Sequence, residues 1–453
     1  MTIELAPVTV PDFGLPLARP TVPAEVYEAR CRAAYQRAGC DWLVVYADRE
    51  HFANIAFLCE FEPRFEEALL ILGPQERRII VTGNECVSFA EIVTRLSAIE
   101  VHLCQAMSLP GQDRSEAPGL TAVLSSIGIR DGHRVGLVGW KPAMREPGED
   151  AGFFVPSVYV DALRRLTLDY DAVSDCTDVL MHPEQGLRAC VDADQIAAFE
   201  WAAARATAAV WRIVTQVREG DSELEAAARM AYAGEPLSAH VMLASSDASG
   251  PVVGLRSPTA RRLSRGDGVT TAVGYWGGLS ARAGLISDGD DRFYKLARSY
   301  FAGLCAWYDS ADIGVRGGDV FEQVTQTLAQ GGLRSMLNPG HLGGHEEWIN
   351  TPIRPASRHT LRSGMVFQVD IIPTPLPLGW ALNCEDPVVL ADEALRAELA
   401  ARHPDVMARI EARRAFMDQK LGISLKPSIL PLGSTPACLP PFWLKSDHLL
   451  VRA

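Results

Sequence analysis

Short apolar runs alternate with helical stretches over residues 20–170. Three runs have the length and branched side chains of buried strands: DWLVVYA (41–47), EALLILG (67–73) and RRIIVTG (77–83). Helices are predicted around and between them, at residues 22–40, 89–96 and 120–126. Strands and helices that take turns in this way predict an α/β domain.

The pattern changes at LMHPEQGLRACVDADQ (180–195). Asp192 and Gln195 form a candidate capping box for an alanine-rich helix that runs to Val217, and Gly220 suits a left-handed stop. Strands are predicted at residues 240–246, 268–274 and 364–373. Helices are predicted at residues 222–234, 293–307, 320–328 and 393–422, the last with a break at Pro404. This half of the chain is therefore predicted to be α+β.

The two ends of the chain lack a period. The first twenty residues are rich in proline and apolar residues, and we expect an arm that lies on the surface. The chain from Pro427 onward is also proline-rich and is expected to pack as irregular chain. The predicted organisation is an arm at residues 1–21, a first domain at 22–172 and a second at 173–453.

Charge and composition narrow the function. The net charge of −13 disfavours a nucleic-acid binder and an acidic membrane surface as partner. No run of about 18 apolar residues appears, so no membrane-spanning helix is predicted. The N-terminal residues lack the pattern of a secretory signal, and the ten cysteines are scattered without a C-x-x-C pair. We therefore expect reduced thiols and a cytoplasmic location.

Acids in apolar surroundings are the first candidates for chemistry. Asp370 stands within the apolar run GMVFQVDIIP, and Glu385 enters another in NCEDPVVL. PGHLGGHEEW adds His341 and His345 beside Glu346 and Glu347. Because a buried carboxylate is costly unless it is paired, such a group suits a divalent cation or an acid–base pair. The alternative is that each has an ordinary structural partner.

These blocks resemble the pita-bread fold family, which includes creatinase, aminopeptidase P, prolidase and methionine aminopeptidase. YADREHFANIAFLCEFEPRFEEALLILG resembles the creatinase/prolidase-type N-terminal domain. The blocks LRSPTARRLSRGD, HEEWINTPI…LRSGMVFQVDIIP and CEDPVVL follow the order of the family's second domain. The resemblance implies an α/β creatinase/prolidase-type N-terminal domain, an α+β pita-bread C-terminal domain and a homodimer.

The resemblance also implies a depleted metal site. The family's peptidases hold two metal ions through two aspartates, a histidine and two further acids. His341, Asp370 and Glu385 match three of these, with Asp370 where the family has Glu. The two aspartates fall near Ala272 and Leu279, which offer no ligand. We therefore expect no cofactor, with one divalent metal on the three retained residues as the alternative.

Creatinase works without metal, through a histidine directly before an R-x-P stretch. Here R-x-P is Arg256-Ser257-Pro258, and Leu255 precedes it. That base is missing as well. His240 is a candidate replacement imidazole that would contact substrate, and a satisfied strand histidine is the alternative.

Four further residues are candidates for substrate binding. Arg64 sits where relatives reach across to the partner's site, with a surface salt bridge as the alternative. Arg282 matches the arginine after the second aspartate, and it would grip a substrate carboxylate or pair with one of the two acids. Glu346 and Trp348 lie next to the histidines, although core packing is the commoner role of tryptophan.

Three functions stay open on these grounds. The first is a creatinase-like, metal-independent hydrolase, or a related lyase, that acts on a C–N bond of a small polar substrate. His341 or His345 would then move protons, and Asp370 and Glu385 would orient them. The second is an Xaa-Pro peptidase-type hydrolase with a single metal. The third is a non-catalytic relative that binds a ligand or a partner.

Overall fold

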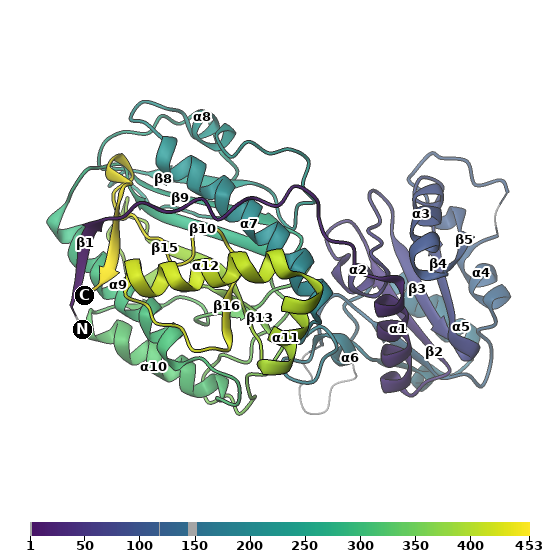
Figure 1. Cartoon of the computed structure of the whole chain (residues 1–453). Coiled ribbons are helices and arrows are strands. Elements are labelled where there is room, and N and C mark those ends of the chain that lie inside the picture. The colour runs from purple at the N-terminus through teal and green to yellow at the C-terminus, as the bar shows by residue number, and fades with distance from the viewer. Residues whose placement is uncertain (1, 117, 144–151) are drawn as a thin grey trace. The chain divides into compact units, whose positions relative to one another are not determined.

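The computed structural model describes residues 2–116, 118–143 and 152–453, which form two compact units (Figure 1). Residues 22–189 make one unit; residues 1–21 and 190–453 make the other. The first unit extends beyond the predicted boundary at residue 172, because β7 (Val173–Asp175) pairs with β6 (Val135–Val138) in its sheet.

The N-terminal unit is built on a mixed six-stranded sheet, with strand order β5-β4-β3-β2-β6-β7. The three apolar runs of the sequence form its buried centre, where β3 is antiparallel to both neighbours. The alternation of strands and helices confirms the α/β prediction. The remaining bounds are β2 Trp42–Ala47, β3 Ala68–Gly73, β4 Arg77–Thr82, β5 Glu100–Leu103, α1 Ala24–Ala38, α2 Ala53–Cys59, α3 Val87–Ser97, α4 Leu120–Ile127, α5 Ser157–Thr167 and α6 Asp178–Met181.

The C-terminal unit contains a seven-stranded antiparallel sheet. Six strands follow the order β12-β13-β15-β10-β9-β8, and β16 pairs with β15. The short pair β11–β14 lies outside this sheet. The strand bounds are β8 Met242–Ser246, β9 Gly268–Tyr275, β10 Gly278–Leu285, β11 Arg334–Ser335, β12 His341–Leu342, β13 Val366–Val369, β14 Pro373–Thr374, β15 Asn383–Leu390 and β16 Ile429–Pro431.

Helices accompany this sheet. The alanine-rich helix α7 lies along β9 and β10 (Figure 1). Close approach needs a glycine, since a Cβ on Gly278 would lie 2.8 Å from Cα of Ala203. The predicted break at Pro404 separates α11 from α12. The bounds are α7 Ala193–Gln216, α8 Glu223–Ala228, α9 Asp291–Ser310, α10 Gly317–Gln330, α11 Glu393–Arg402 and α12 Pro404–Leu421.

Two helix ends follow local chemistry that the sequence predicted in part. The side chain of Asp192 accepts from the backbone N–H of Gln195, as the capping box requires. The helix predicted at 222–234 is shorter: α8 begins with a complete capping box between Ser222 and Glu225, but it ends at Ala228.

The chain termini are more ordered than their sequences suggest. Residues Ile3–Pro7 form β1, which pairs antiparallel with β17 (His448–Arg452) and brings the two ends together (Figure 1). The predictions of a plain surface arm and an irregular tail are therefore wrong for these strands. A local pattern cannot show a pairing between residues that lie at opposite ends of the chain. None of the described helices is both long and apolar enough to cross a membrane.

Candidate functional site

Strand register aligns one row of side chains across the C-terminal sheet. Glu385 in β15 is opposite Ala281 in β10, Ala281 is opposite Ala272 in β9, and Ala272 is opposite Met242 in β8. Because directly opposed residues point to the same side of a sheet, these four side chains share one face.

The histidine and the aspartate lie on that same face. His341 in β12 is opposite Gln368 in β13, which is opposite Pro387 in β15. Pro387 lies two residues after Glu385, and Asp370 lies two residues after Gln368, so the period of two keeps all of them on one side. Pairing therefore brings together three residues that are 44 positions apart at most in the sequence.

The three side chains converge in the interior. One donor atom each from His341, Asp370 and Glu385 lies within 4.8 Å of the other two. All three residues are buried. Oδ1 of Asp370 and Oε1 of Glu385 have no hydrogen-bond partner among the described residues. A buried carboxylate oxygen without a partner is costly, so this group needs protons or a cation.

Burial sets the protonation of the two acids. It raises the pKa of Asp370 to about 7, although His341 pulls that pKa down. It raises the pKa of Glu385 well above the usual range, and the charges of Asp370 and Glu347 raise it further. Burial lowers the pKa of His341, but Glu347, with smaller contributions from Asp370 and the backbone of Leu342, raises that pKa above its ordinary value. The group is therefore inclined to hold protons at neutral pH.

Glu347 is a site residue that the sequence analysis placed beside the histidines but gave no role. Its Oε1 lies 2.9 Å from Nε2 of His341, and its side chain is 32% exposed, which connects the buried ring to solvent. Trp348 stacks on the same ring at a centroid distance of 4.0 Å. The predicted acid, Glu346, is half-buried and accepts from the backbone N–H of Gly344 through its carbonyl. HEEW signals an acid beside the site, but the spacing does not tell which of the two turns inward.

Gln368 is a site residue that sequence reasoning missed. It is buried on the face of the acids, opposite His341, and its Oε1 has no hydrogen-bond partner among the described residues. Its place two positions before Asp370 in FQVD is the signal that would have found it.

Apolar side chains occupy the positions of the two expected aspartates. Ala272 and Leu279 form a buried cluster with Met242 and Ala281. Ala281 is directly opposite Glu385, so this cluster borders the acid group. Neither predicted position offers a ligand, and low polarity beside Glu385 adds to the cost of its charge.

Arg282 does not reach the acid group. It is fully buried, and its Nη2 donates to both carboxylate oxygens of Asp386 at 2.9 and 2.8 Å. Further donations go to backbone oxygens of Glu385, Thr435 and Cys438. The strand period places Arg282 and Asp386 on the face opposite Ala281 and Glu385. Its predicted role as a substrate clamp, and its alternative pairing with Asp370 or Glu385, are therefore wrong.

The other predicted histidines lie apart from the converging donors. His345 is buried, and its ring meets those of Phe199 and Trp276 edge-on at 5.5 and 5.4 Å. His240 is exposed, and its Nε2 lies 2.9 Å from the backbone oxygen of Leu255. In the described parts of the chain, the donor group contains His341 but neither of these two.

Arg64 belongs to the N-terminal unit. It forms an ion pair with Glu62 at 3.1 Å, and its guanidinium lies over the ring of Phe89. The surface salt bridge that was the alternative reading is therefore present. Its reach into a partner subunit of a homodimer stays a prediction.

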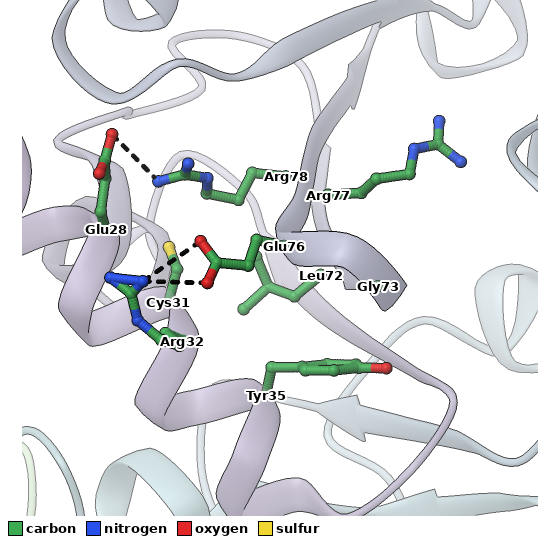
Figure 2. A pocket seen from close by; sticks show the side chains of 9 residues that line it. All are labelled: Glu28, Cys31, Arg32, Tyr35, Leu72, Gly73, Glu76, Arg77 and Arg78. Atoms are coloured by element: carbon green, nitrogen blue, oxygen red, sulfur yellow. Dashed lines mark hydrogen bonds and ion pairs between the residues drawn. The ribbon is translucent and has the colours of Figure 1, made fainter.

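A small pocket in the N-terminal unit is a weaker candidate for a functional site. Its volume is about 30 Å³, and Figure 2 shows two pairs of opposite charges in its lining. Arg32 pairs with Glu76 at 3.1 Å, and Arg78 pairs with Glu28 at 3.5 Å. Burial raises the pKa of Cys31 to about 12, which leaves its thiol unreactive.

Comparison with solved structures assigns the fold. The chain matches an Xaa-Pro dipeptidase from Bacillus anthracis with a TM-score of 0.60 and 17% identity, over 82% of this chain and 96% of that one. It matches a prolidase from Pyrococcus horikoshii OT3 with a TM-score of 0.62 and 15% identity, over 81% and 95%. It matches an X-Pro aminopeptidase from Thermotoga maritima MSB8 with a TM-score of 0.58 and 16% identity, over 80% of this chain and 95% of that one.

The sequence itself matches no protein-family profile and no curated protein. At identities this low the likeness shows the fold. The two-part pita-bread architecture that the sequence blocks predicted is thereby confirmed.

The buried pair predicts a purely structural role for Arg282. Arg282→Met should lower the free energy of unfolding by about 3–5 kcal/mol, because it leaves the charge of Asp386 buried without a partner. Adding Asp386→Asn should recover part of the loss. Urea denaturation measures both. A variant with wild-type stability and a raised KM would contradict this role.

The raised pKa values predict a stability gain when the acids are neutralised. Each acid ionises at a higher pH in the folded than in the unfolded state, so stability falls as pH rises from the unfolded towards the folded pKa. Asp370→Asn and Glu385→Gln avoid this loss. With a chelator present, the free energy of unfolding of each variant should exceed that of the wild type by on the order of 1–3 kcal/mol at about pH 8.5. The difference should be smaller at about pH 5.

Urea titrations at both values provide the measurement. If the amide variants are less stable than the wild type at the higher pH, the protein stabilises the ionised forms of Asp370 and Glu385, and the prediction is wrong.

Proposed function

We propose that this chain, which has the fold of prolidases and Xaa-Pro aminopeptidases, is a hydrolase that cleaves a C–N bond of a small polar substrate. One observation carries the proposal: two buried acids with unpartnered oxygens converge on a buried histidine. Such a group lowers stability, as strained and polar groups at functional sites do. Its retention favours an active site over a decayed scaffold.

The unequal environments of the two acids suggest a division of roles. His341 lowers the pKa of Asp370, whereas neighbouring carboxylates raise that of Glu385. Asp370 is therefore the base that takes a proton from the attacking water, and Glu385 is the acid that gives its proton to the leaving nitrogen. As the C–O bond forms, Asp370 gains a proton from water. As the C–N bond breaks, Glu385 loses its proton to the nitrogen. Transfer between the two neighbouring acids restores the starting state.

His341 supplies positive charge beside them. Glu347 favours its protonated form and orients Nε2, and Trp348 covers one face of the ring. An imidazolium held in this way would stabilise negative charge that develops on the substrate oxygen during attack. These roles describe a metal-independent hydrolysis in which two acids, and not a histidine as in creatinase, transfer the protons.

A single-metal hydrolase of the Xaa-Pro peptidase type is the second candidate. One imidazole and two carboxylates with unpartnered oxygens fit one divalent cation. Such an ion, when bound, would polarise the substrate carbonyl and acidify a water molecule. His341, Asp370 and Glu385 would hold it. A second ion does not fit, because Ala272 and Leu279 offer no donor.

The hydrolase proposal predicts that His341→Ala abolishes turnover. Removing the imidazole takes away the charge that stabilises the transition state, so the rate should fall by at least about 100-fold. Release of primary or secondary amine is measured over a panel of Xaa-Pro dipeptides, guanidino acids and N-acyl amino acids, with and without Mn²⁺. The matched control is His102→Ala, a histidine of the N-terminal unit outside the site.

Turnover that survives His341→Ala would remove His341 from the mechanism. The absence of amine release from every class, with either metal condition, would favour a non-catalytic binding protein.

The apolar cluster predicts how many ions the site holds. Equilibrium dialysis against Mn²⁺ should give no more than one ion per chain for the wild type, because the positions of the two aspartates in the two-ion ligand set are apolar. The double variant Ala272→Asp with Leu279→Asp should gain an ion and a Tm that rises with Mn²⁺. Two tightly bound ions in the wild type would overturn this assignment. Turnover in the presence of a chelator separates the metal-independent candidate from the single-metal candidate.

A further inference from the structure

A cleft of about 490 Å³ in the C-terminal unit shares Trp348 with the acid group. Its lining comes from α10, from the segment that leads into His341, and from the chain around Trp348. Its volume lies in the range of sites for small organic ligands, and it is large for a single amino-acid side chain.

Large apolar side chains form part of the lining of the cleft, beside the polar residues Thr325, Ser335 and Asn338. Phe321, Met336, Leu337 and Trp348 line it, and Met336 and Leu337 are 58% and 48% exposed. Large apolar side chains that gather around a hollow and remain exposed are typical of a binding surface.

Arg334 is the only ionisable residue among those that line the cleft. Its guanidinium is exposed and has no ion pair or hydrogen bond with any described residue. Nearby arginines are held: Arg316 pairs with Asp319 at 2.8 Å, and Arg354 meets His359 at 3.2 Å. Arg334 therefore offers a cation to a ligand rather than to the protein.

Ser335 adds a second polar group. Its Oγ is buried and has no hydrogen-bond partner among the described residues. The backbone of Ser335 is opposite Pro373 in β14, and Met336 donates its backbone N–H to Ile372. These bonds fix the wall of the cleft to the chain directly after Asp370, so cleft and acid group share one support.

We infer that this cleft binds the end of the substrate that carries a carboxylate next to an apolar or aromatic body. Arg334 and Ser335 receive the carboxylate, and Phe321, Met336 and Leu337 receive the body. The inference rests on the proposed hydrolase function, because only a hydrolase would make the bound molecule a substrate. It narrows the substrate to an amphipathic organic acid.

Charge gives the ligand one orientation. Trp348 lines the cleft and also stacks on His341, where three carboxylic acids surround one imidazole, so a carboxylate is attracted to Arg334 and not to this acid-rich group. A bound ligand therefore keeps its carboxylate away from the acid group and turns its other end towards Trp348 and His341. The C–N bond to be cleaved belongs at that end.

Isothermal titration calorimetry with 4-phenylbutyrate and its uncharged analogue 4-phenylbutanamide tests the inference. We expect the wild type to bind the acid at least about tenfold more tightly than the amide, the discrimination that a charge-assisted bidentate contact gives. Arg334→Gln should lose this preference. Arg130→Gln, at an exposed position of the other unit, should keep it.

A second variant checks the apolar part of the lining. Met336→Asp, at an exposed position, should weaken both ligands at least about tenfold by placing a charge against the body. Circular dichroism confirms that each variant is folded. Equal affinities of the wild type for acid and amide, no binding of either, or an unchanged preference in Arg334→Gln would each overturn the inference.

The assay does not depend on turnover, so the two proposals fail separately. Arg334-dependent binding without amine release from any substrate class would support the cleft as a carboxylate-binding site and contradict the hydrolase proposal. Amine release that depends on His341 but not on Arg334, with no binding of 4-phenylbutyrate, would retain the hydrolase and remove the cleft.

Discussion

The structure depends on how two adjacent acids of one strand are compensated. Asp386 points to one face of the sheet, where Arg282 neutralises its charge and the backbone N–H of Ala437 donates a hydrogen bond to it. Glu385 points to the other face, where it meets Asp370 and an apolar cluster. Since the strand period sends neighbours to opposite sides, one strand carries both a satisfied ion pair and an unsatisfied acid. The first supports the fold, and the second is available for chemistry.

Sheet pairing transmits this arrangement to the rest of the unit. His341 lies in β12, Glu385 lies in β15 and Asp370 directly follows β13, so no two of them are neighbours in sequence. Their distances are fixed only because β12, β13 and β15 are hydrogen-bonded side by side. α7 packs tightly against β10 through Gly278, which keeps the neighbouring part of the sheet in place. A rigid support of this kind is what a reactive group needs.

Local pattern was sufficient for most elements and for the acids, and it failed where the answer depends on distant chain. Buried strands and the break at Pro404 follow from periodicity and from the geometry of proline. The β1–β17 pairing does not, because its partners lie at opposite ends of the chain. Arg282 was misplaced because its face is set by register with β15. Glu346 was given a role in place of Glu347 because a turn decides which of two adjacent acids faces His341.

The apolar residues beside the acids change the chemistry that the site favours. Carboxylates at Ala272 and Leu279 would add negative charge, which only bound cations could offset. Alanine and leucine add no charge and lower the local polarity. The remaining acids are therefore neutralised at the lowest free-energy cost when they bind protons. The same substitutions therefore weaken a two-metal site and strengthen a proton-transfer site. Under the proposed function, the acids of this site therefore transfer protons, and no metal pair is needed to offset their charge.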